Sequence, residues 1–310
     1  MPGSMVVTTE KVGAYARLGN IYFFDQHLCF LVALSLLPYA VLRDTGNWWC
    51  MLALFAGYYL LHHATASFDD ISGFRDGSDA RNYLDNPNFK RKAEYKPLIL
   101  GQLTLREALW CAWSCTVVGG ILLTIGFIAA PFHPIWLVIF AALMVVLCLQ
   151  YSYGLNLSHI GGQELVLFCG ISLPVPVMYL LFTGEMKPVV IMQTLLLGLW
   201  QMLVSMYSNL RDREVDLANG RINMVTKAAP RSVERMVIGF MVAEPVVVVG
   251  FVAAAGVSPW YLAMLIPIGA LRVKQFRDGA DDALSARLLG RRILELGIAL
   301  LVVLNIITQH

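Results

Sequence analysis

The sequence predicts an all-α, polytopic membrane protein, built as a bundle of nine transmembrane helices. Its 310 residues are 58% hydrophobic and 14% charged, whereas roughly a quarter of the residues in a soluble domain are charged. Nine apolar stretches are suited to crossing a hydrocarbon core of roughly 30 Å. Basic residues also concentrate in alternate connections. These observations argue against a water-soluble enzyme and favour one transmembrane domain over residues 1–310, with residues 1–22 as a cytosolic or interfacial segment.

The apolar stretches follow one another along almost the whole chain. They are Phe23–Leu42, Trp48–Phe68, Ala108–Ala130, Pro134–Leu149, Leu165–Thr183, Val189–Ser208, Met236–Ala255, Trp260–Leu271 and Ile293–Ile307. The fourth and eighth are short, so their borders are expected to shift by a few residues.

Lysine and arginine residues fall almost entirely on one side of this arrangement. The N-terminal segment and the connections after the second, sixth and eighth stretches hold 21 of the 23 basic residues, and only Arg43 and Lys187 lie elsewhere. Cytoplasmic loops of membrane proteins are rich in such residues. We therefore expect an integral membrane protein whose N-terminus and even-numbered connections are cytoplasmic.

Cysteine and histidine residues in the apolar stretches carry no clear signal for a site. The six cysteines lack the paired spacing of zinc ligands, and Cys111 and Cys115, four residues apart, are interpreted as packing. His62 and His63 are interpreted as paired core histidines, with a hydrogen bond to a site carboxylate as the alternative.

The connection after the second stretch begins with an acidic segment. If the helix continues into it, Asp69 and Asp76 lie seven residues apart on one face. Asp70 is adjacent to Asp69, and Asp79 follows Asp76 by three residues. The spacing predicts carboxylates that converge at the cytoplasmic end of this helix.

The connection after the sixth stretch carries a second acidic segment. Asp212 and Asp216 are four residues apart, and Asn209 precedes Asp212 by one turn, so their oxygens share a helix face. Crowded carboxylates repel one another unless a cation is present. Mg²⁺ prefers oxygen ligands and binds through one or two carboxylates plus substrate phosphates. We expect the residues of both segments to hold Mg²⁺.

Basic residues accompany both acidic segments, and their cationic groups pair well with phosphate oxygens. Arg75, Lys92, Arg211 and Lys227 are the candidates for phosphate contact, with lipid-headgroup anchoring as the alternative. This arrangement at the mouth of an apolar bundle suits a diphosphate joined to a long hydrocarbon tail. A solvated juxtamembrane loop is the simpler explanation of either acidic segment alone. Their recurrence on one side, four helices apart, favours a site.

In these motifs the sequence resembles the UbiA superfamily of intramembrane prenyltransferases, and within it the 1,4-dihydroxy-2-naphthoate polyprenyltransferase branch. Four segments carry the resemblance over most of the chain, and the last of them is the most specific. They are Asp69–Asp79; Arg91 with Lys96–Leu98, Gly101 and Thr104–Ala108; Tyr151–Gly154 with Gly161–Glu164 and Phe168–Gly170; and Asn209–Asp216 with Gly220 and Thr226. The resemblance implies a nine-helix UbiA-like bundle, Mg²⁺ as cofactor and a polyprenyl diphosphate as substrate.

The first motif departs from the pattern of this branch. Asp69 stands where the family usually has Asn, and Gly73 replaces its second Asp, a ligand that Asp76 is placed to supply. The stretch Ala80–Lys90 is also longer than the usual spacer. These departures concern the acceptor substrate more than the chemistry at the diphosphate.

Three further residues are candidates for contact with a substrate. Glu164, at the start of the fifth predicted helix, is a candidate catalytic base or orienting group for an acceptor hydroxyl, although the helix dipole alone also favours a carboxylate there. Tyr151 and Tyr153 are candidates for lining the same entrance, with an interfacial aromatic belt as the alternative.

The sequence thus favours Mg²⁺-dependent transfer of a prenyl group from a polyprenyl diphosphate to an aromatic or quinol-like acceptor. Cyclisation of the same diphosphate without an acceptor, as in superfamily members that resemble terpene cyclases, is the alternative. An ion-coupled transporter also has carboxylates near the membrane, but transporter sites lie near the midplane rather than at the rim. Membrane lipid is the expected surrounding, and no nucleic-acid partner is expected.

Overall fold

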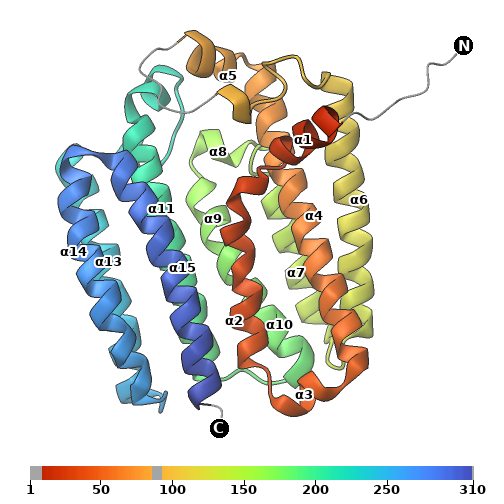
Figure 1. The fold of residues 1–310 in the computed structure, drawn as a ribbon, viewed down its shortest axis with the longest axis vertical. Coiled ribbons are helices and arrows are strands. Elements are labelled where there is room, and N and C mark those ends of the chain that lie inside the picture. Colours follow the sequence, from red (N-terminus) through yellow and green to blue (C-terminus); the bar gives the residue numbers. More distant parts are fainter. Residues whose placement is uncertain (1–8, 86–92, 309–310) are drawn as a thin grey trace, which may run out of the picture.

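Long helices run side by side through the structure, a computed structural model that describes residues 9–85 and 93–308 (Figure 1). All regular elements of the described residues are helical, as the composition predicts. The longest are α4 (Thr45–Arg75), α6 (Leu105–Ala129), α7 (Ile135–Leu149), α11 (Pro188–Ala218), α13 (Pro230–Ala254), α14 (Leu265–Asp281) and α15 (Ala283–Thr308).

Other parts of the bundle consist of consecutive shorter helices. They are η1 (Ile21–Leu28) with α2 (Cys29–Leu36), α9 (Gln163–Ser172) with α10 (Pro174–Thr183), and η4 (Pro259–Met264), which leads into α14. The prediction of one helix over Phe23–Leu42 is wrong. Pro38 disfavours helical backbone at Leu37, so α2 ends at Leu36 and α3 (Tyr39–Arg43) starts after the proline.

Short helices cover the end of the bundle at the top of Figure 1, where α1, α5 and α8 lie. They are α1 (Thr9–Leu18), α5 (Ser78–Ala80), η2 (Arg81–Asp85), η3 (Ala93–Tyr95), α8 (Leu157–Ile160) and α12 (Met224–Lys227). The backbone N–H of Ile222 donates to the carbonyl of His159 at 2.8 Å. This bond ties the connection before α9 to the one that follows α11.

The second acidic segment continues α11 as its spacing predicts, whereas the first continues α4 only to its C-cap Asp76, and Asp79 lies in the separate helix α5. Helix α4 ends at Arg75 and α11 at Ala218, beyond the ends of the apolar stretches at Phe68 and Ser208. The C-terminal ends of α4 and α11 lie at the same end of the bundle, among the short helices (Figure 1). The fold therefore brings together two segments that are far apart in the sequence.

Helices α4 and α6 make the most extensive helix pair of the bundle, and glycine permits their close approach. A Cβ atom added to Gly57 would lie 2.8 Å from the backbone nitrogen of Leu123 and 2.9 Å from the carbonyl oxygen of Gly119. Small residues allow membrane helices to approach backbone to backbone in this way. The register between these two helices fixes the positions of the α4 residues along the bundle axis.

The outer surface of the bundle is apolar, as contact with lipid requires. Helix α6 exposes Trp110 by 65% and Ile128 by 68%. Among the described residues, the spans long and apolar enough to cross a membrane are Leu105–Ala129, Gln163–Thr183, Pro188–Ala218 and Pro230–Ala254. The count of nine crossings stays a prediction.

Alanine at Gly57 tests the contact between α4 and α6. We expect Gly57→Ala to lower the free energy of unfolding by about 1–3 kcal/mol, because its Cβ meets backbone that cannot rotate away. Thermal unfolding in detergent measures the effect. Gly120→Ala is the matched control, since a Cβ there meets no atom within 4 Å. Equal melting temperatures for the two variants would contradict the packing described.

Candidate active site

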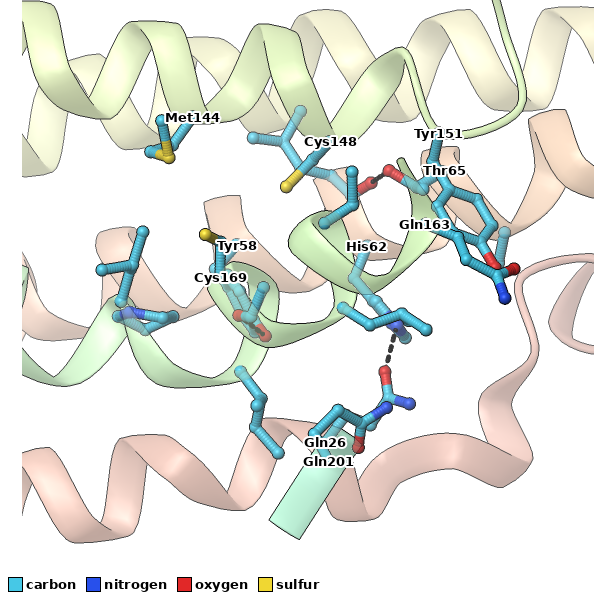
Figure 2. Close-up of a pocket in the computed structure, with 18 of the residues that line it drawn as sticks. Gln26, Tyr58, His62, Thr65, Met144, Cys148, Tyr151, Gln163, Cys169 and Gln201 are labelled. Atoms are coloured by element: carbon cyan, nitrogen blue, oxygen red, sulfur yellow. Dashed lines mark hydrogen bonds between the residues drawn. The ribbon is translucent and has the colours of Figure 1, made fainter. Parts of the chain in front are cut away.

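A cavity of about 370 Å³ runs along the inner face of α4. Its lining includes α4 residues from Leu54 to Asp69, which spans about 22 Å of helix. Leu54, Phe127, Met178 and Leu181 give apolar walls, and the carboxylates stand near the ends of α4 and α11. Figure 2 shows side chains of the wall, among them Tyr58, Met144 and Cys148. Such a long apolar cavity with polar groups at one end accommodates an amphiphile with a charged head.

Asp69 lines this cavity and accepts a hydrogen bond from Ser152 Oγ at 2.5 Å. Burial raises the pKa of its carboxyl group, but the positive charges of Lys96 and Arg221, together with the Ser152 bond, outweigh that effect. The pKa therefore lies below its usual value, and Asp69 presents a negative charge to the cavity at neutral pH.

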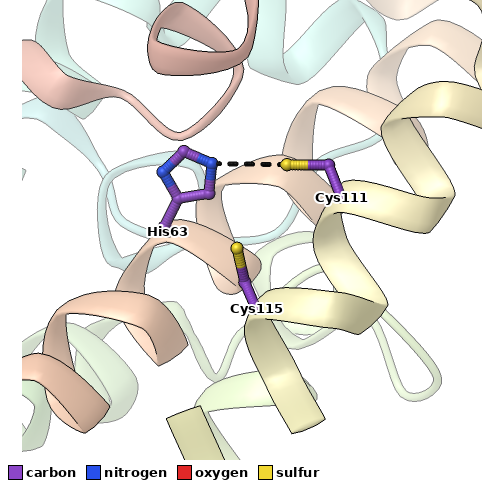
Figure 3. A group of neighbouring side chains, drawn as sticks. All are labelled: His63, Cys111 and Cys115. Atoms are coloured by element: carbon purple, nitrogen blue, oxygen red, sulfur yellow. Dashed lines mark hydrogen bonds between the residues drawn. The ribbon is translucent and has the colours of Figure 1, made fainter. Parts of the chain in front are cut away.

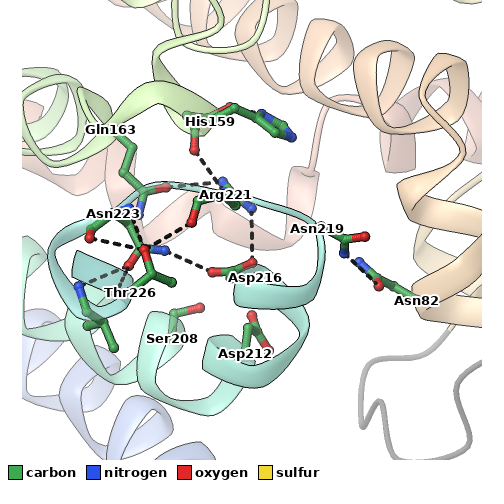
Figure 4. A network of polar contacts seen from close by, with 12 residues as sticks. Asn82, His159, Gln163, Ser208, Asp212, Asp216, Asn219, Arg221, Asn223 and Thr226 are labelled. Atoms are coloured by element: carbon green, nitrogen blue, oxygen red, sulfur yellow. Dashed lines mark hydrogen bonds and ion pairs between the residues drawn. The ribbon is translucent and has the colours of Figure 1, made fainter. Parts of the chain in front are cut away.

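Helix α11 presents Asn209, Asp212 and Asp216 to the same cavity, on the shared face that their spacing predicts. Asp212 forms a bidentate ion pair with the neighbouring Arg211, at 2.6 Å for each bond. Asp216 accepts a hydrogen bond from Asn223 Nδ2 at 2.9 Å. Both carboxylates thus stand near cations or amide donors that fix their orientation, as Figure 4 shows for Asp216.

Arg221 lines the cavity between the two acidic segments. Its Nε donates to the carbonyl of Ser158 at 2.8 Å and its Nη2 to Gln163 Oε1 at 3.1 Å, and Nη1 lies 3.9 Å from Asp216 Oδ1 (Figure 4). A rigidly held guanidinium suits the recognition of phosphate oxygens. Sequence reasoning missed this residue, although it lies between Gly220 and Thr226 of the most specific motif.

The first acidic segment divides into two parts with different partners. Asp70 and Asp79 both face Lys96, whose Nζ lies 2.6 Å from Asp70 Oδ1 and 3.1 Å from Asp79 Oδ2. They are buried and do not line the cavity in the described structure. Gly73 makes this possible, because a Cβ there would lie 2.6 Å from Asp79 Cγ. The glycine that replaces the second Asp of the family motif therefore leaves the space in which the Asp79 side chain reaches Lys96.

Asp76 and two of the predicted phosphate contacts lie away from the cavity wall. Asp76 is exposed, accepts a bond from the backbone N–H of Ser78 and lies 3.8 Å from His159 Nε2. Arg75 is exposed, and Lys227 is exposed with its Nζ against Gly161. Arg211 is held by Asp212, and Lys92 lies outside the described residues.

Of the three remaining sequence candidates, one lines the cavity and two do not. Tyr151 lines the cavity (Figure 2), whereas Tyr153 packs on the ring of Phe68 with centroids 4.6 Å apart. Glu164 is buried outside the cavity lining, and its Oε1 accepts a bond from the backbone N–H of Met224 at 2.7 Å. That bond holds the start of α12.

A second polar region of the cavity was not predicted from the sequence, in which His62 was interpreted as a core histidine. Asp25 forms a bidentate pair with Arg291 of α15, at 2.8 and 2.9 Å, and Gln26 Oε1 lies 2.8 Å from His62 Nε2 (Figure 2). All four residues line the cavity. The signal available in the sequence was Asp25 itself, a carboxylate inside the first apolar stretch, which must find a partner.

Comparison with known proteins identifies the fold. The profile of the UbiA prenyltransferase family matches residues 28–292. A UbiA homolog from Aeropyrum pernix K1, solved in its apo form, is 15% identical with a TM-score of 0.64 over 93% of this chain and 98% of its own. No curated protein sequence matches the chain.

Two further solved structures share the arrangement. One is described as digeranylgeranylglyceryl phosphate synthase in membranes and is 15% identical, with a TM-score of 0.59 over 96% of this chain and 99% of its own. The other is a UbiA homolog from Archaeoglobus fulgidus bound to DMAPP and Mg²⁺, which is 10% identical with a TM-score of 0.58 over 95% and 97%. These matches confirm the predicted UbiA-like, all-α fold.

Lys96→Met tests the role of the cation between Asp70 and Asp79. We expect a loss of about 3–5 kcal/mol of unfolding free energy near pH 8, because two buried carboxylates then lack a partner. With Lys96 present, burial raises the pKa of Asp70 to about 7. Removal of the Lys96 charge raises this pKa further, so the folded variant binds a proton that the unfolded state releases. The variant regains stability as the pH falls, and its loss relative to the wild type should be smaller at about pH 5 than near pH 8.

Lys274→Met is the matched control for this measurement by thermal unfolding. Lys274 pairs with Asp278 at 2.8 Å, but the two side chains are 62% and 34% exposed. Exposed pairs contribute about 0–1 kcal/mol. Equal losses in both variants, or a Lys96→Met loss that does not change with pH, would show that the buried pair is not the cause.

Proposed function

The chain belongs to the UbiA prenyltransferase family, and from that premise we propose that it is a Mg²⁺-dependent prenyltransferase of the membrane. Its substrate is a polyprenyl diphosphate, and its acceptor is aromatic or quinol-like, as in the 1,4-dihydroxy-2-naphthoate branch. The N-terminus and the acidic end of the cavity lie on the cytoplasmic side. The observation that carries the proposal is the placement of Asp69, Asn209, Asp212 and Asp216 at one end of a single apolar cavity.

The donor set fits Mg²⁺. All four residues offer oxygen atoms, the ligands that Mg²⁺ prefers, and the space beside them leaves room for phosphate oxygens and water to complete its shell. Asp69 and the α11 carboxylates come from helices whose ends the fold brings together. We propose these four residues as the metal-holding set, while Asp70 and Asp79 act through Lys96. When bound, Mg²⁺ would neutralise the charge on a leaving pyrophosphate.

The protein's own cations and apolar walls supply the rest of the mechanism. Arg221 donates toward phosphate oxygens from a fixed position, which stabilises negative charge as the bond to the prenyl carbon breaks. The apolar wall residues exclude water from the allylic cation; they are Leu54, Phe127, Met178 and Leu181. The rings of Tyr58 and Phe127 line the same cavity and can face that cation, an interaction that favours positive charge.

The acceptor requires polar groups inside the cavity, and the structure offers Gln26, His62 and Gln201 there (Figure 2). The hydrogen-bonded imidazole of His62 and amide of Gln26 both line the cavity, so they can contact a hydroxyl group of an acceptor bound there. Glu164 contacts the backbone of Met224 instead. We therefore propose the His62 and Gln26 pair, ahead of Glu164, as the group that orients the acceptor.

A product analysis tests the proposed reaction. Purified protein with Mg²⁺ and farnesyl or geranylgeranyl diphosphate, with and without a dihydroxynaphthoate-type acceptor, should give a prenylated acceptor and pyrophosphate. If a hydrocarbon product forms without acceptor, the reaction is cyclisation of the diphosphate, and the proposed prenyl transfer is wrong. Release of no pyrophosphate under any condition would contradict both reactions.

Asp212→Ala and Asp216→Ala test the metal-holding set. We expect each to lower the rate of pyrophosphate release by about 10²-fold or more, because charge on the leaving group is no longer neutralised. Asp216→Asn should keep the bond to Asn223 but raise the Mg²⁺ concentration needed for half-maximal rate. Asp278→Ala, at an exposed pair with Lys274, is the control. Wild-type rates in both alanine variants would refute the assignment.

A further inference from the structure

Three soft ligand groups meet between α4 and α6, outside the cavity. His63 of α4 and Cys111 and Cys115 of α6 place their ligand atoms within 4.8 Å of one another (Figure 3). Cys111 Sγ lies 3.7 Å from His63 Nε2. None of the three is among the described residues that line the cavity, so the group does not belong to the proposed active site.

The local structure explains why these groups face one another. Cys111 and Cys115 are spaced i, i+4 on α6, which puts both thiols on one face of the helix, and that face packs on α4. Gly19 lies directly against the His63 ring, where a Cβ would stand 1.7 Å from Nδ1. The glycine therefore leaves room for the ring, whose Nε2 is directed at the thiols (Figure 3).

The dimensions suit a small thiophilic cation. Zinc binds thiolate sulfur at about 2.3 Å and imidazole nitrogen at about 2.0 Å, which places tetrahedral ligands about 3.5–3.8 Å apart. The pair formed by Cys111 and His63 already has this separation. The other separations, none of them above 4.8 Å, close by a rotation about the Cα–Cβ bond of a cysteine.

Charge selects among the thiophilic cations. Two thiolates, one neutral imidazole and Zn²⁺ form a complex with no net charge, whereas Cu⁺ in the same ligands leaves a net charge of −1. A net charge is costly in the low-dielectric surroundings of a membrane bundle. The three protein ligands leave the fourth tetrahedral position to a small ligand such as water.

We propose that His63, Cys111 and Cys115 form a zinc site that cross-links α4 to α6 about 9 Å below Asp69 along the axis of α4. Binding releases the two thiol protons to solvent, and no electron is transferred. The site joins the helix that carries Asp69 to its main packing partner. This assignment replaces the interpretation of the two cysteines as packing and of His63 as a core histidine, and it is independent of the proposed prenyl transfer.

Cobalt substitution tests the site on the purified full-length chain. Protein treated with a chelator is titrated with Co²⁺ in the presence of excess Mg²⁺, which occupies carboxylate sites. We expect a thiolate-to-cobalt charge-transfer absorption, which carboxylate ligands do not produce, to saturate at one equivalent and to disappear on addition of Zn²⁺. Absence of this absorption in the wild-type protein would overturn the proposal.

Single-residue variants test whether the cobalt absorption comes from His63, Cys111 and Cys115 or from other cysteines. His63→Ala, Cys111→Ser and Cys115→Ser should each lower the absorption more than tenfold at one equivalent of Co²⁺, and Cys169→Ser, on the cavity wall, should leave it unchanged. Retention of the absorption in a Cys111→Ser, Cys115→Ser double variant would also overturn the proposal.

A measurement on the wild-type protein keeps the test decisive where a variant does not fold. Zn²⁺ should slow alkylation of Cys111 and Cys115, read residue by residue by mass spectrometry, while leaving Cys148 and Cys169 unchanged. Equal alkylation of Cys111 and Cys115 with and without Zn²⁺ would contradict the site.

Discussion

Every charge buried in this apolar bundle requires an oppositely charged or hydrogen-bonding partner, and the structure depends on that constraint. Charge is scarce in the sequence, yet carboxylates gather at the ends of α4 and α11. Lys96 is held between Asp70 and Asp79, Arg211 pairs with Asp212, and a bidentate pair joins Asp25 to Arg291. Unpaired carboxylates in such surroundings would destabilise the fold by several kcal/mol each.

The paired charges form a rigid frame around the four oxygen-bearing residues that face the cavity. Ser152 fixes Asp69, and Asn223 fixes Asp216. Fixed donors and acceptors need little reorganisation when charge develops on a substrate, which is how preorganised sites stabilise transition states. The same frame explains why acidic residues that are adjacent in the sequence, Asp69 and Asp70, have different surroundings and different proposed roles.

Helical periodicity predicted the part of the site that lies on single helices. The spacing of Asn209, Asp212 and Asp216 placed them on one face, and α11 continues through them as expected. The pairing of Lys96 with Asp70 could not be predicted, because it depends on how the connection before α6 folds back over α4. Arg291 reaches Asp25 across 266 positions of sequence, and the break at Pro38 was hidden within an apolar stretch.

The central claim is that Asp69, Asn209, Asp212 and Asp216 hold Mg²⁺ beside a prenyl diphosphate. A crystal structure with Mn²⁺ and a non-hydrolysable prenyl thiodiphosphate tests this claim most directly, because manganese is located by anomalous scattering. We expect anomalous peaks at about 2.0–2.3 Å from carboxylate oxygens of Asp69 and of Asp212 or Asp216, with the hydrocarbon tail running toward Leu54. Peaks at Asp70 and Asp79, or none at the cavity mouth, would contradict the account.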